Sequence, residues 1–290
     1  MKKIAVQNLK GGSAKTTTSI SIAHCLAMMG HHVCLIDADV QGSIRSALNI
    51  KHEFGLYDLM IENIPLDEVL VRDVRENLDV VISDKNLARA EQALVSMPRR
   101  EEILSFRLRG LVDYDYVIID CAPSLSQMHH NALLYADELV IPISMDFLAL
   151  MGSAQIFESV KLIRDLWEKD LRVAGILPTY VNRQQSICRD IINCIEQAYG
   201  RYGQRILPEI RQDMNLRKCV ALHETIFDFL GIHDVKDIRD EHRSAYDYFQ
   251  VTQCLVGEND ERAKRFEKGD VAVRGGFTGD TRRNLAETQS

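Results

Sequence analysis

The sequence lacks the cysteine spacing that zinc and iron–sulfur sites require. Seven cysteines are present, an odd number, and no two of them form a Cys-x-x-Cys pair. Most lie within apolar runs, where a thiol behaves as a small hydrophobic side chain. We therefore predict reduced core thiols and exclude a carrier of metal clusters. The seven are Cys25, Cys34, Cys121, Cys188, Cys194, Cys219 and Cys254.

Long hydrophobic segments are also missing. No stretch is apolar over the ~18 residues that a membrane-spanning helix needs. The apolar run at the N-terminus is interrupted by Gln7, Asn8 and Lys10 and is far too short for a signal peptide. The last residues, RRNLAETQS, offer no amphipathic helix with basic and bulky apolar faces. We predict a cytoplasmic protein with no membrane partner.

The chain has no excess of positive charge. Lys and Arg total 35 against 42 Asp and Glu, so the formal net charge is -7 and the sequence pI is about 5.7. No global cationic field draws such a protein onto nucleic acid, and any contact with DNA must use a local basic patch. With 46% hydrophobic and 27% charged residues among 290, the composition is that of an ordinary globular protein with a sizeable core.

Short apolar runs alternate with longer segments of helical periodicity. Expected strands are residues 3–8, 33–37, 78–83, 116–120, 138–142 and 172–177, and expected helices include 15–29, 186–199 and 238–255. This alternation predicts an α/β fold, a doubly wound and mostly parallel sheet with helices on both faces. Residues 1–256 should form one domain. Residues 257–290 are charged and contain glycine, which predicts a solvated or disordered tail.

A glycine-containing turn joins the first expected strand to the first helix. It reads Leu9, Lys10, Gly11, Gly12, Ser13, Ala14, Lys15, Thr16 and Thr17. Backbone N–H groups of such a turn and the helix N-terminus attract phosphate, the Lys15 ammonium adds a full charge, and the Thr16 hydroxyl suits Mg²⁺. The usual G-x-x-x-x-G-K-[ST] pattern is broken at Leu9 and Ala14, and the form K-G-G-x-x-K-[ST] fits instead. We predict a nucleoside triphosphate site.

Four later segments follow in order: DADVQG at 37–42, YDYVIIDCAPSLS at 114–126, ILPTYVNR at 176–183 and IRQDMNLRKC at 210–219. With these five motifs, residues 2–255 resemble the deviant Walker A ATPases of the ParA/Soj/MinD family, closest to ParA-type partition ATPases without an N-terminal DNA-reading domain. The resemblance implies the P-loop NTPase fold, ATP hydrolysis, and ATP and Mg²⁺ as cofactors.

The sequence departs from the family pattern at several positions. Ala14 replaces a residue that is usually Gly, which disfavours a positive φ there. Val40 and Ala122 replace prolines, Asn182 replaces Asp, and Lys218-Cys219 replaces Glu-Ala. Because none of these changes removes a phosphate, metal or water contact, ATP hydrolysis is still expected.

The resemblance also implies roles for single residues. The catalytic group would be Lys10, Lys15 and Asp39, in which Lys10 crosses a sandwich dimer to the second subunit's phosphates, as an arginine finger does in trans. Asp39 would position or activate the attacking water. Together with Thr16, Asp37 and Asp120 would hold Mg²⁺. Simple caps at strand ends are the competing interpretation of Asp37 and Asp39.

The resemblance implies further roles. Asp146 would lie near the ribose across the dimer, although a polar loop start explains it as well. Arg183, Ile210 and Arg211 would flank the adenine, largely through backbone groups. Candidates for a DNA patch are Arg211, Arg217, Lys218 and Arg243, each of which also fits a plain solvated surface residue.

The implied function is plasmid or chromosome partition. An ATP-dependent homodimer would bind DNA nonspecifically, associate with the nucleoid in this state, and be stimulated by a ParB-like activator. One alternative is a MinD-like membrane-positioning ATPase, for which the C-terminal helix is missing. Another is a positioning ATPase for a protein cargo, which shares all the chemistry, so the sequence leaves that alternative open.

Overall fold

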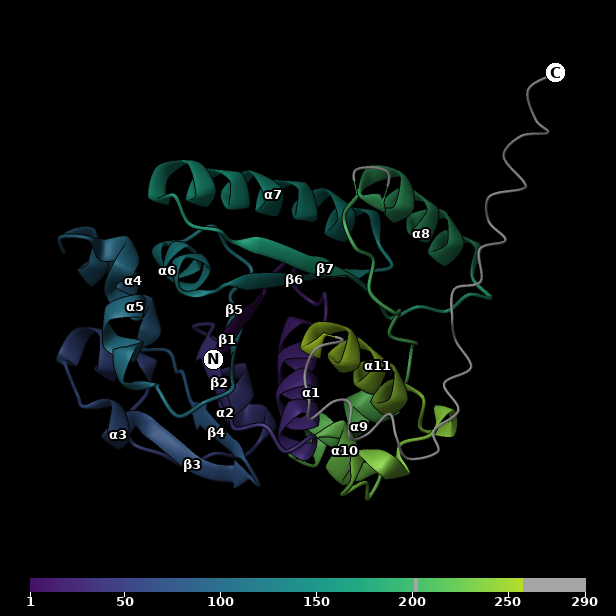
Figure 1. The fold of residues 1–290 in the computed structure, drawn as a ribbon, viewed down its shortest axis with the longest axis horizontal. Helices are drawn as coiled ribbons and strands as arrows, with labels where there is room; N and C mark the ends of the chain where they lie inside the picture. Colours follow the sequence, from purple (N-terminus) through teal and green to yellow (C-terminus); the bar gives the residue numbers. More distant parts are fainter. Residues whose placement is uncertain (201–202, 258–290) are drawn as a thin grey trace.

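The computed structural model describes residues 1–200 and 203–257. Within these residues, strands form one sheet in the order β3-β4-β2-β5-β1-β6-β7 (Figure 1). All neighbouring strands are parallel except β3 and β4, which are antiparallel. The bounds are β1 Lys2–Val6, β2 Val33–Ala38, β3 Leu70–Arg75, β4 Leu78–Val81, β5 Tyr116–Cys121, β6 Glu138–Ser144 and β7 Arg172–Thr179.

Helices cover both faces of the sheet, which confirms the predicted doubly wound fold. In Figure 1, α7 and α8 lie on one side of the strands and α1, α9, α10 and α11 on the other. The bounds are α1 Lys15–Met28, α2 Ser43–Ala47, α3 Leu66–Val69, α4 Leu87–Val95, α5 Ile103–Arg107, α6 Gln127–Tyr135, α7 Phe147–Trp167, α8 Ser186–Ala198, α9 Asn215–Ala221, α10 Ile226–Phe229 and α11 Ser244–Val256. No helix in the described part of the chain is long and apolar enough to cross a membrane.

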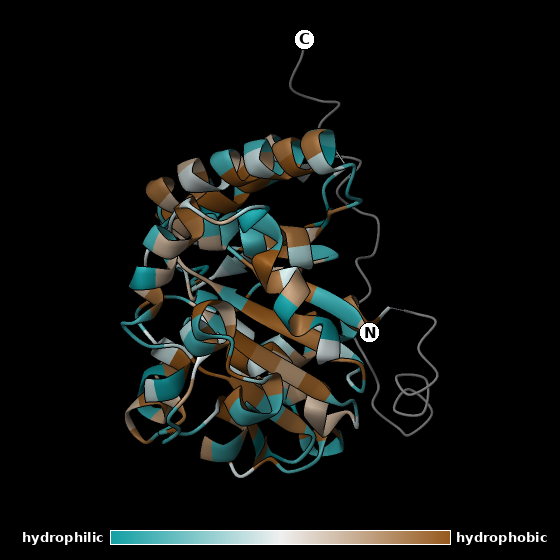
Figure 2. Cartoon of the chain, turned by 90° about the vertical axis from the view of Figure 1, so that its left-hand side faces the viewer, coloured by the Kyte–Doolittle hydropathy of each residue, from teal (hydrophilic) through white to brown (hydrophobic). Residues whose placement is uncertain are grey.

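The strands are apolar on both sides because each face has its own core. Successive side chains of a strand point to opposite faces. In β1, Ile4 and Val6 pack in the core on the α1 side, whereas Ala5 packs in the core beneath α7. The interior strands are accordingly brown in Figure 2. This two-sided burial leaves only the carboxyl ends of the strands for polar chemistry.

Two elements differ from the prediction. Strand β3 was not expected, because its sequence LVRDVR mixes charge with apolar residues; it is an exposed edge strand containing Asp73 at φ +53°. The last helix begins at Ser244, six residues later than expected, because a short 3₁₀ turn and Arg243 at φ +44° precede it. The predicted tail lies outside the described residues apart from Gly257.

Candidate functional site

The loop between β1 and α1 curls over the carboxyl end of β1. Gly12 and Ala14 both adopt left-handed backbone conformations, with φ +79° and +68°. Glycine tolerates this readily, whereas for Ala14 it costs about 1–2 kcal/mol. Ala14 is the residue that caps α1, and its methyl group supplies no capping hydrogen bond. Because the first N–H groups of a helix lack intrahelical acceptors, they remain available to an anion.

Lys15 is a nearly buried ammonium at this loop, with an exposed fraction of 7%. Its Nζ donates to the Lys10 carbonyl at 3.2 Å, which is the one acceptor it has among the described residues for three N–H donors. Burial lowers the pKa of Lys15, and the Asp120 and Asp39 carboxylates oppose that shift. The Ser13 hydroxyl is also buried without a partner in this part of the chain. Unpaired donors of this kind fit phosphate oxygens.

Asp120 lies near the carboxyl end of the apolar strand β5 and faces two hydroxyls of α1. Thr16 Oγ1 donates to Asp120 Oδ2 at 2.7 Å, and Ser19 Oγ donates to Oδ1 at 3.0 Å. Burial raises the pKa of Asp120 to about 7, against the lowering effect of these hydrogen bonds. Because Thr16 gives its proton to Asp120, its oxygen lone pairs stay free for a hard cation such as Mg²⁺. Thr16 and Asp120 therefore fit the predicted metal role.

Ser19 was not among the predicted site residues. Its spacing of three residues from Thr16 puts both hydroxyls on one face of α1, and that spacing is the signal that could have revealed it. By holding the second oxygen of the Asp120 carboxylate, Ser19 orients the first toward Thr16.

The two carboxylates at the carboxyl end of β2, Asp37 within the strand and Asp39 just after it, have different surroundings. Asp37 is fully buried and accepts the N–H groups of Asp39 at 3.1 Å and Ile44 at 3.0 Å, so it fastens the turn that leads into α2. Burial and the neighbouring Asp120 raise the pKa of Asp37 well above its ordinary value. Asp39 accepts the Gln41 N–H at 3.0 Å through Oδ1. Its Oδ2 has no partner among the described residues and is available to orient a water; the metal role of Asp37 stays a prediction.

The buried side-chain amide of Asn8 stabilises the start of the loop through hydrogen bonds. This residue was not among the site residues predicted from the sequence. Its Nδ2 donates to the Pro142 carbonyl at 2.7 Å and to the Ala149 carbonyl at 3.3 Å, while its Oδ1 accepts the Lys10 N–H at 3.0 Å. Helix α7 approaches so closely that a Cβ on Gly152 would lie 3.1 Å from Asn8 Oδ1. The phosphate loop and the first turns of α7 thus form one packed unit.

The beginning of α7 combines a cap with an exposed apolar surface. Asp146 caps the helix, with Oδ1 accepting the Ala149 N–H at 2.9 Å. Phe147, Leu148 and Met151, which we call the α7 patch, have exposed fractions of 61%, 66% and 57%. Large apolar side chains grouped beside a site indicate a surface that another molecule covers. The ribose contact of Asp146 stays a prediction beside its capping role.

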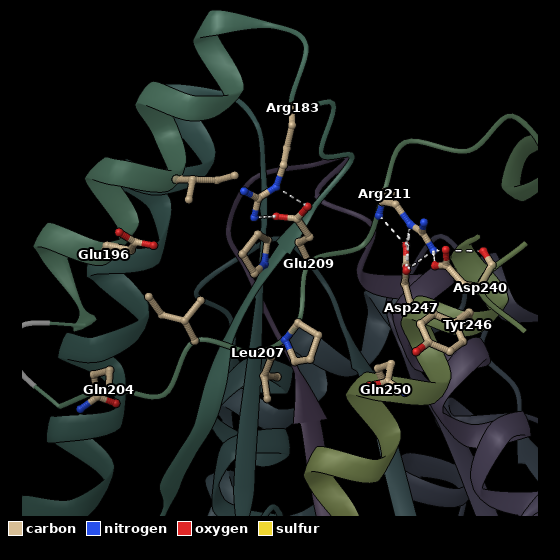
Figure 3. Close-up of a pocket in the computed structure, with 14 residues that line it drawn as sticks. Arg183, Glu196, Gln204, Leu207, Glu209, Arg211, Asp240, Tyr246, Asp247 and Gln250 are labelled. Carbon is tan, nitrogen blue, oxygen red and sulfur yellow. Dashed lines mark hydrogen bonds and ion pairs between the residues drawn. The ribbon is translucent and has the colours of Figure 1, made fainter. Parts of the chain in front are cut away.

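Arg183, Ile210 and Arg211 lie at the outer edge of the sheet, where Arg183 and Arg211 line a separate cavity (Figure 3). Arg183 binds Glu209 through two hydrogen bonds of 2.8 and 2.7 Å. Ile210 uses its backbone N–H and carbonyl in pairing with Pro178 and Val181. No phosphate-loop residue lines this cavity. This cavity therefore gives no support to the adenine contacts of these three residues, and those contacts stay predictions.

The four candidate DNA residues fall into two groups. Arg211 is held by Asp247 at 2.8 Å and by Asp240 at 2.8 Å, so its charge is compensated. The side chains of Arg217 and Lys218 on α9 and of Arg243 before α11 are exposed and have no ion-pair partner in the described ranges. These three cations are the ones free to meet phosphate.

Comparisons with known proteins agree with this geometry. A family model described as an AAA domain matches residues 1–173. The sporulation initiation inhibitor protein Soj of Bacillus subtilis is 36% identical over 202 residues, which cover 68% of this chain and 80% of that protein. The chromosome partitioning protein ParA of Myxococcus xanthus is 32% identical over 238 residues, or 80% and 82% of the two chains.

Solved structures share the fold. Apo McdA of Cyanothece superposes with a TM-score of 0.77 at 22% identity, covering 88% of this chain and 99% of that one. At this identity the likeness concerns the fold alone. Cobyrinic acid a,c-diamide synthase of Mycobacterium smegmatis, solved with ADP and magnesium, gives a TM-score of 0.69 at 29% identity and covers 79% and 93% of the two chains.

Proposed function

The chain belongs to the ParA/Soj family of P-loop ATPases, and we propose that it forms an ATP-dependent sandwich dimer, binds DNA nonspecifically and partitions plasmid or chromosome cargo with a ParB-like activator. Its cofactors are ATP and Mg²⁺. The observation that carries the proposal is the α7 patch, which exposes apolar side chains directly beside the phosphate loop.

Several groups of the chain contribute to ATP binding. The N–H groups at the start of α1 and the Lys15 ammonium bind phosphate oxygens and offset their charge. Thr16 and Asp120 hold Mg²⁺, which when bound neutralises charge that develops on the phosphates. Asn8, which donates to the Ala149 carbonyl of α7, already holds the Lys10 N–H, so the start of the loop needs little further ordering when ATP binds.

The same packing suggests how hydrolysis is organised. Asp39 offers a free carboxylate oxygen at the carboxyl end of β2, where it can accept a hydrogen bond from the attacking water. Asp37 holds the backbone of the Asp39 turn through two hydrogen bonds and thereby sets the position of that carboxylate. The reaction is the transfer of the terminal phosphoryl group to water, giving ADP and phosphate.

The α7 patch supports self-association in the proposed dimer. Leu148→Glu should reduce ATP-dependent dimerisation at least about tenfold, because a charge would replace an apolar contact at the covered surface. Light scattering with ATP and with ADP measures this. Leu166→Glu is the matched control, since Leu166 is 64% exposed at the far end of the same helix. Equal dimerisation of the two variants would argue against the patch.

The Lys10 ammonium has no hydrogen-bond or ion-pair partner within the described ranges, which suits a role across the dimer. We expect Lys10→Ala to weaken ATP-dependent dimerisation and turnover while the monomer keeps its affinity for ADP. Titration with a fluorescent ADP analogue, paired with sedimentation in ATP, separates the two effects. An equal loss of ADP affinity would place Lys10 on its own nucleotide.

DNA binding should require the dimer. With a net charge of -7, a monomer is repelled by duplex, whereas a dimer doubles the patch of Arg217, Lys218 and Arg243. Affinity should then fall linearly with salt on logarithmic axes, with a slope of about -0.9 per neutralised phosphate.

We expect the double variant Arg217→Glu and Lys218→Glu to flatten this slope and leave basal ATP hydrolysis nearly unchanged, because α9 lies outside the phosphate loop. Duplex binding in ATP, in ADP and without nucleotide, at several salt concentrations, tests it. Lys161→Glu with Arg189→Glu is the control, since it changes the charge equally on α7 and α8, across the sheet. Tight binding without nucleotide, or none with ATP at low salt, would refute the DNA role.

A further inference from the structure

The sheet does not end at β7. Residues 205–211 run parallel to β7, with bridges from Ile176 to Ile206 and from Val181 to Arg211. The Leu207 N–H donates to the Ile176 carbonyl at 2.8 Å. Because backbone groups of alternate residues face opposite directions, the N–H and carbonyl of Ile206 face away from β7. Neither has a partner among the described residues, so this short segment presents an open sheet edge.

A groove of about 660 Å³ lies over this edge, between α8 and α11 (Figure 3). We call it the edge groove. Its apolar lining comes from residues of β7, α8 and the edge segment: Pro178, Ile192, Ile206, Leu207 and Pro208. One end is closed by Asp247, which accepts the Arg211 N–H at 2.8 Å. The groove therefore offers room for a few extended residues beside the free backbone groups.

The charged residues around the edge groove are mainly acidic. Four carboxylates and two guanidinium groups line it, giving a net charge of -2: Glu196, Glu209, Asp240 and Asp247 against Arg183 and Arg211. Both arginines are already bound by carboxylates of the set. Glu196 is exposed on α8 and has no ion-pair partner in the described part of the chain. The carboxylates that no arginine neutralises therefore give the edge groove a negative potential beside its apolar lining residues.

We propose that the edge groove binds a short extended peptide from a partner protein, with basic and aliphatic residues, which adds to the sheet as an outer strand. Main-chain hydrogen bonds to Ile206 supply affinity. Successive side chains of the peptide contact the apolar lining residues and the carboxylates of the groove in alternation. A second copy of this chain fits poorly, because two grooves of charge -2 would repel each other. The inference is independent of the dimer and DNA steps proposed above.

The test uses the full chain and a fluorescein-labelled peptide, Lys-Val-Arg-Val-Lys, followed by fluorescence anisotropy at low salt. Two isomers of the peptide are N-methylated at alternate amides. Because only alternate amides of an added strand face Ile206, we expect one isomer to lose affinity at least about fivefold and the other to bind within about twofold of the parent.

Charge is tested in parallel. Glu196→Lys should lower the affinity of the protein for the parent peptide at least about fivefold. Glu158→Lys, on the exposed face of α7, should leave that affinity unchanged. Unchanged affinity of both methylated isomers would mean simple electrostatic attraction, and an equal loss of affinity would mean no alternation of main-chain contacts; either result would overturn the strand. Equal binding by the two protein variants would place the peptide elsewhere, and no saturable binding up to about 1 mM would overturn the proposal.

Discussion

Asp39→Ala is expected to keep ATP binding intact and to lower ATP hydrolysis about 100-fold or more, the range that a positioned base contributes. In the structure Asp39 does not hold the phosphate loop; its Oδ1 accepts the Gln41 N–H and its Oδ2 is free. We therefore expect the carboxylate to act on the water of the reaction and to leave ground-state ATP binding unaffected. Single-turnover hydrolysis, measured beside equilibrium ATP binding, separates the two.

A trapped ATP-bound dimer should accumulate in the Asp39→Ala protein. Asp165→Ala, an exposed carboxylate on α7, is the control for loss of one charge. If Asp39→Ala hydrolyses ATP at the wild-type rate, the assignment of Asp39 to the water is wrong. If the Asp39→Ala protein loses ATP binding as well as hydrolysis, Asp39 contributes to binding ATP before the reaction.

Lys15→Ala should abolish nucleotide binding, with a loss of affinity of about 100-fold or more for both ATP and ADP. A charge-assisted hydrogen bond to phosphate in a water-poor site is worth about 1.5–3 kcal/mol, and Lys15 has two N–H donors without a protein acceptor in the described ranges. The nucleotide-induced rise of the melting temperature measures it, because a ligand stabilises only the form that binds it.

Lys15→Gln provides a second version of this test, since it keeps a hydrogen-bond donor and removes the charge. Losing the ammonium also removes a positive neighbour of the buried Asp120, so the melting temperature without nucleotide is recorded for each variant. A wild-type thermal shift with ATP in a folded Lys15→Ala protein would contradict the role of Lys15.

Motifs and periodicity determined the fold class and predicted the residues at the core of the site. The order of strands and helices predicted a doubly wound sheet, because alternating apolar runs and helical segments have few other ways to bury both faces. A phosphate-binding loop was predicted because Lys15 and Thr16 come soon after a strand and open a helix, the placement that lets them reach phosphate. The family assignment, which rests on five ordered motifs, is confirmed by the relatives.

Long-range contacts are what the sequence did not reveal. Asn8 reaches Pro142 and Ala149, more than 130 positions along the chain, and only the pairing of β6 with β1 and the position of α7 beside the loop bring them together. The sequence predicts that Arg211 is a cation free to bind DNA, yet the carboxylate of Asp247, 36 residues away, binds it. Hydrogen bonds of this range carry no periodic signal, because each depends on how elements far apart in the sequence pack together.

The sequence alone therefore determined the fold class and predicted which residues bind phosphate, since that chemistry is local and a strand, a turn and a helix N-terminus suffice for it. Only the tertiary structure decided which other polar groups are free and which are already bound. In the folded chain both carboxylate oxygens of Asp37 accept backbone N–H groups, whereas Asp39 keeps one free oxygen. The α7 patch lies beside the phosphate loop for the same reason, the packing of distant segments. The physical reason is that satisfying a buried polar group requires a partner in space, and the fold supplies that partner from anywhere in the chain.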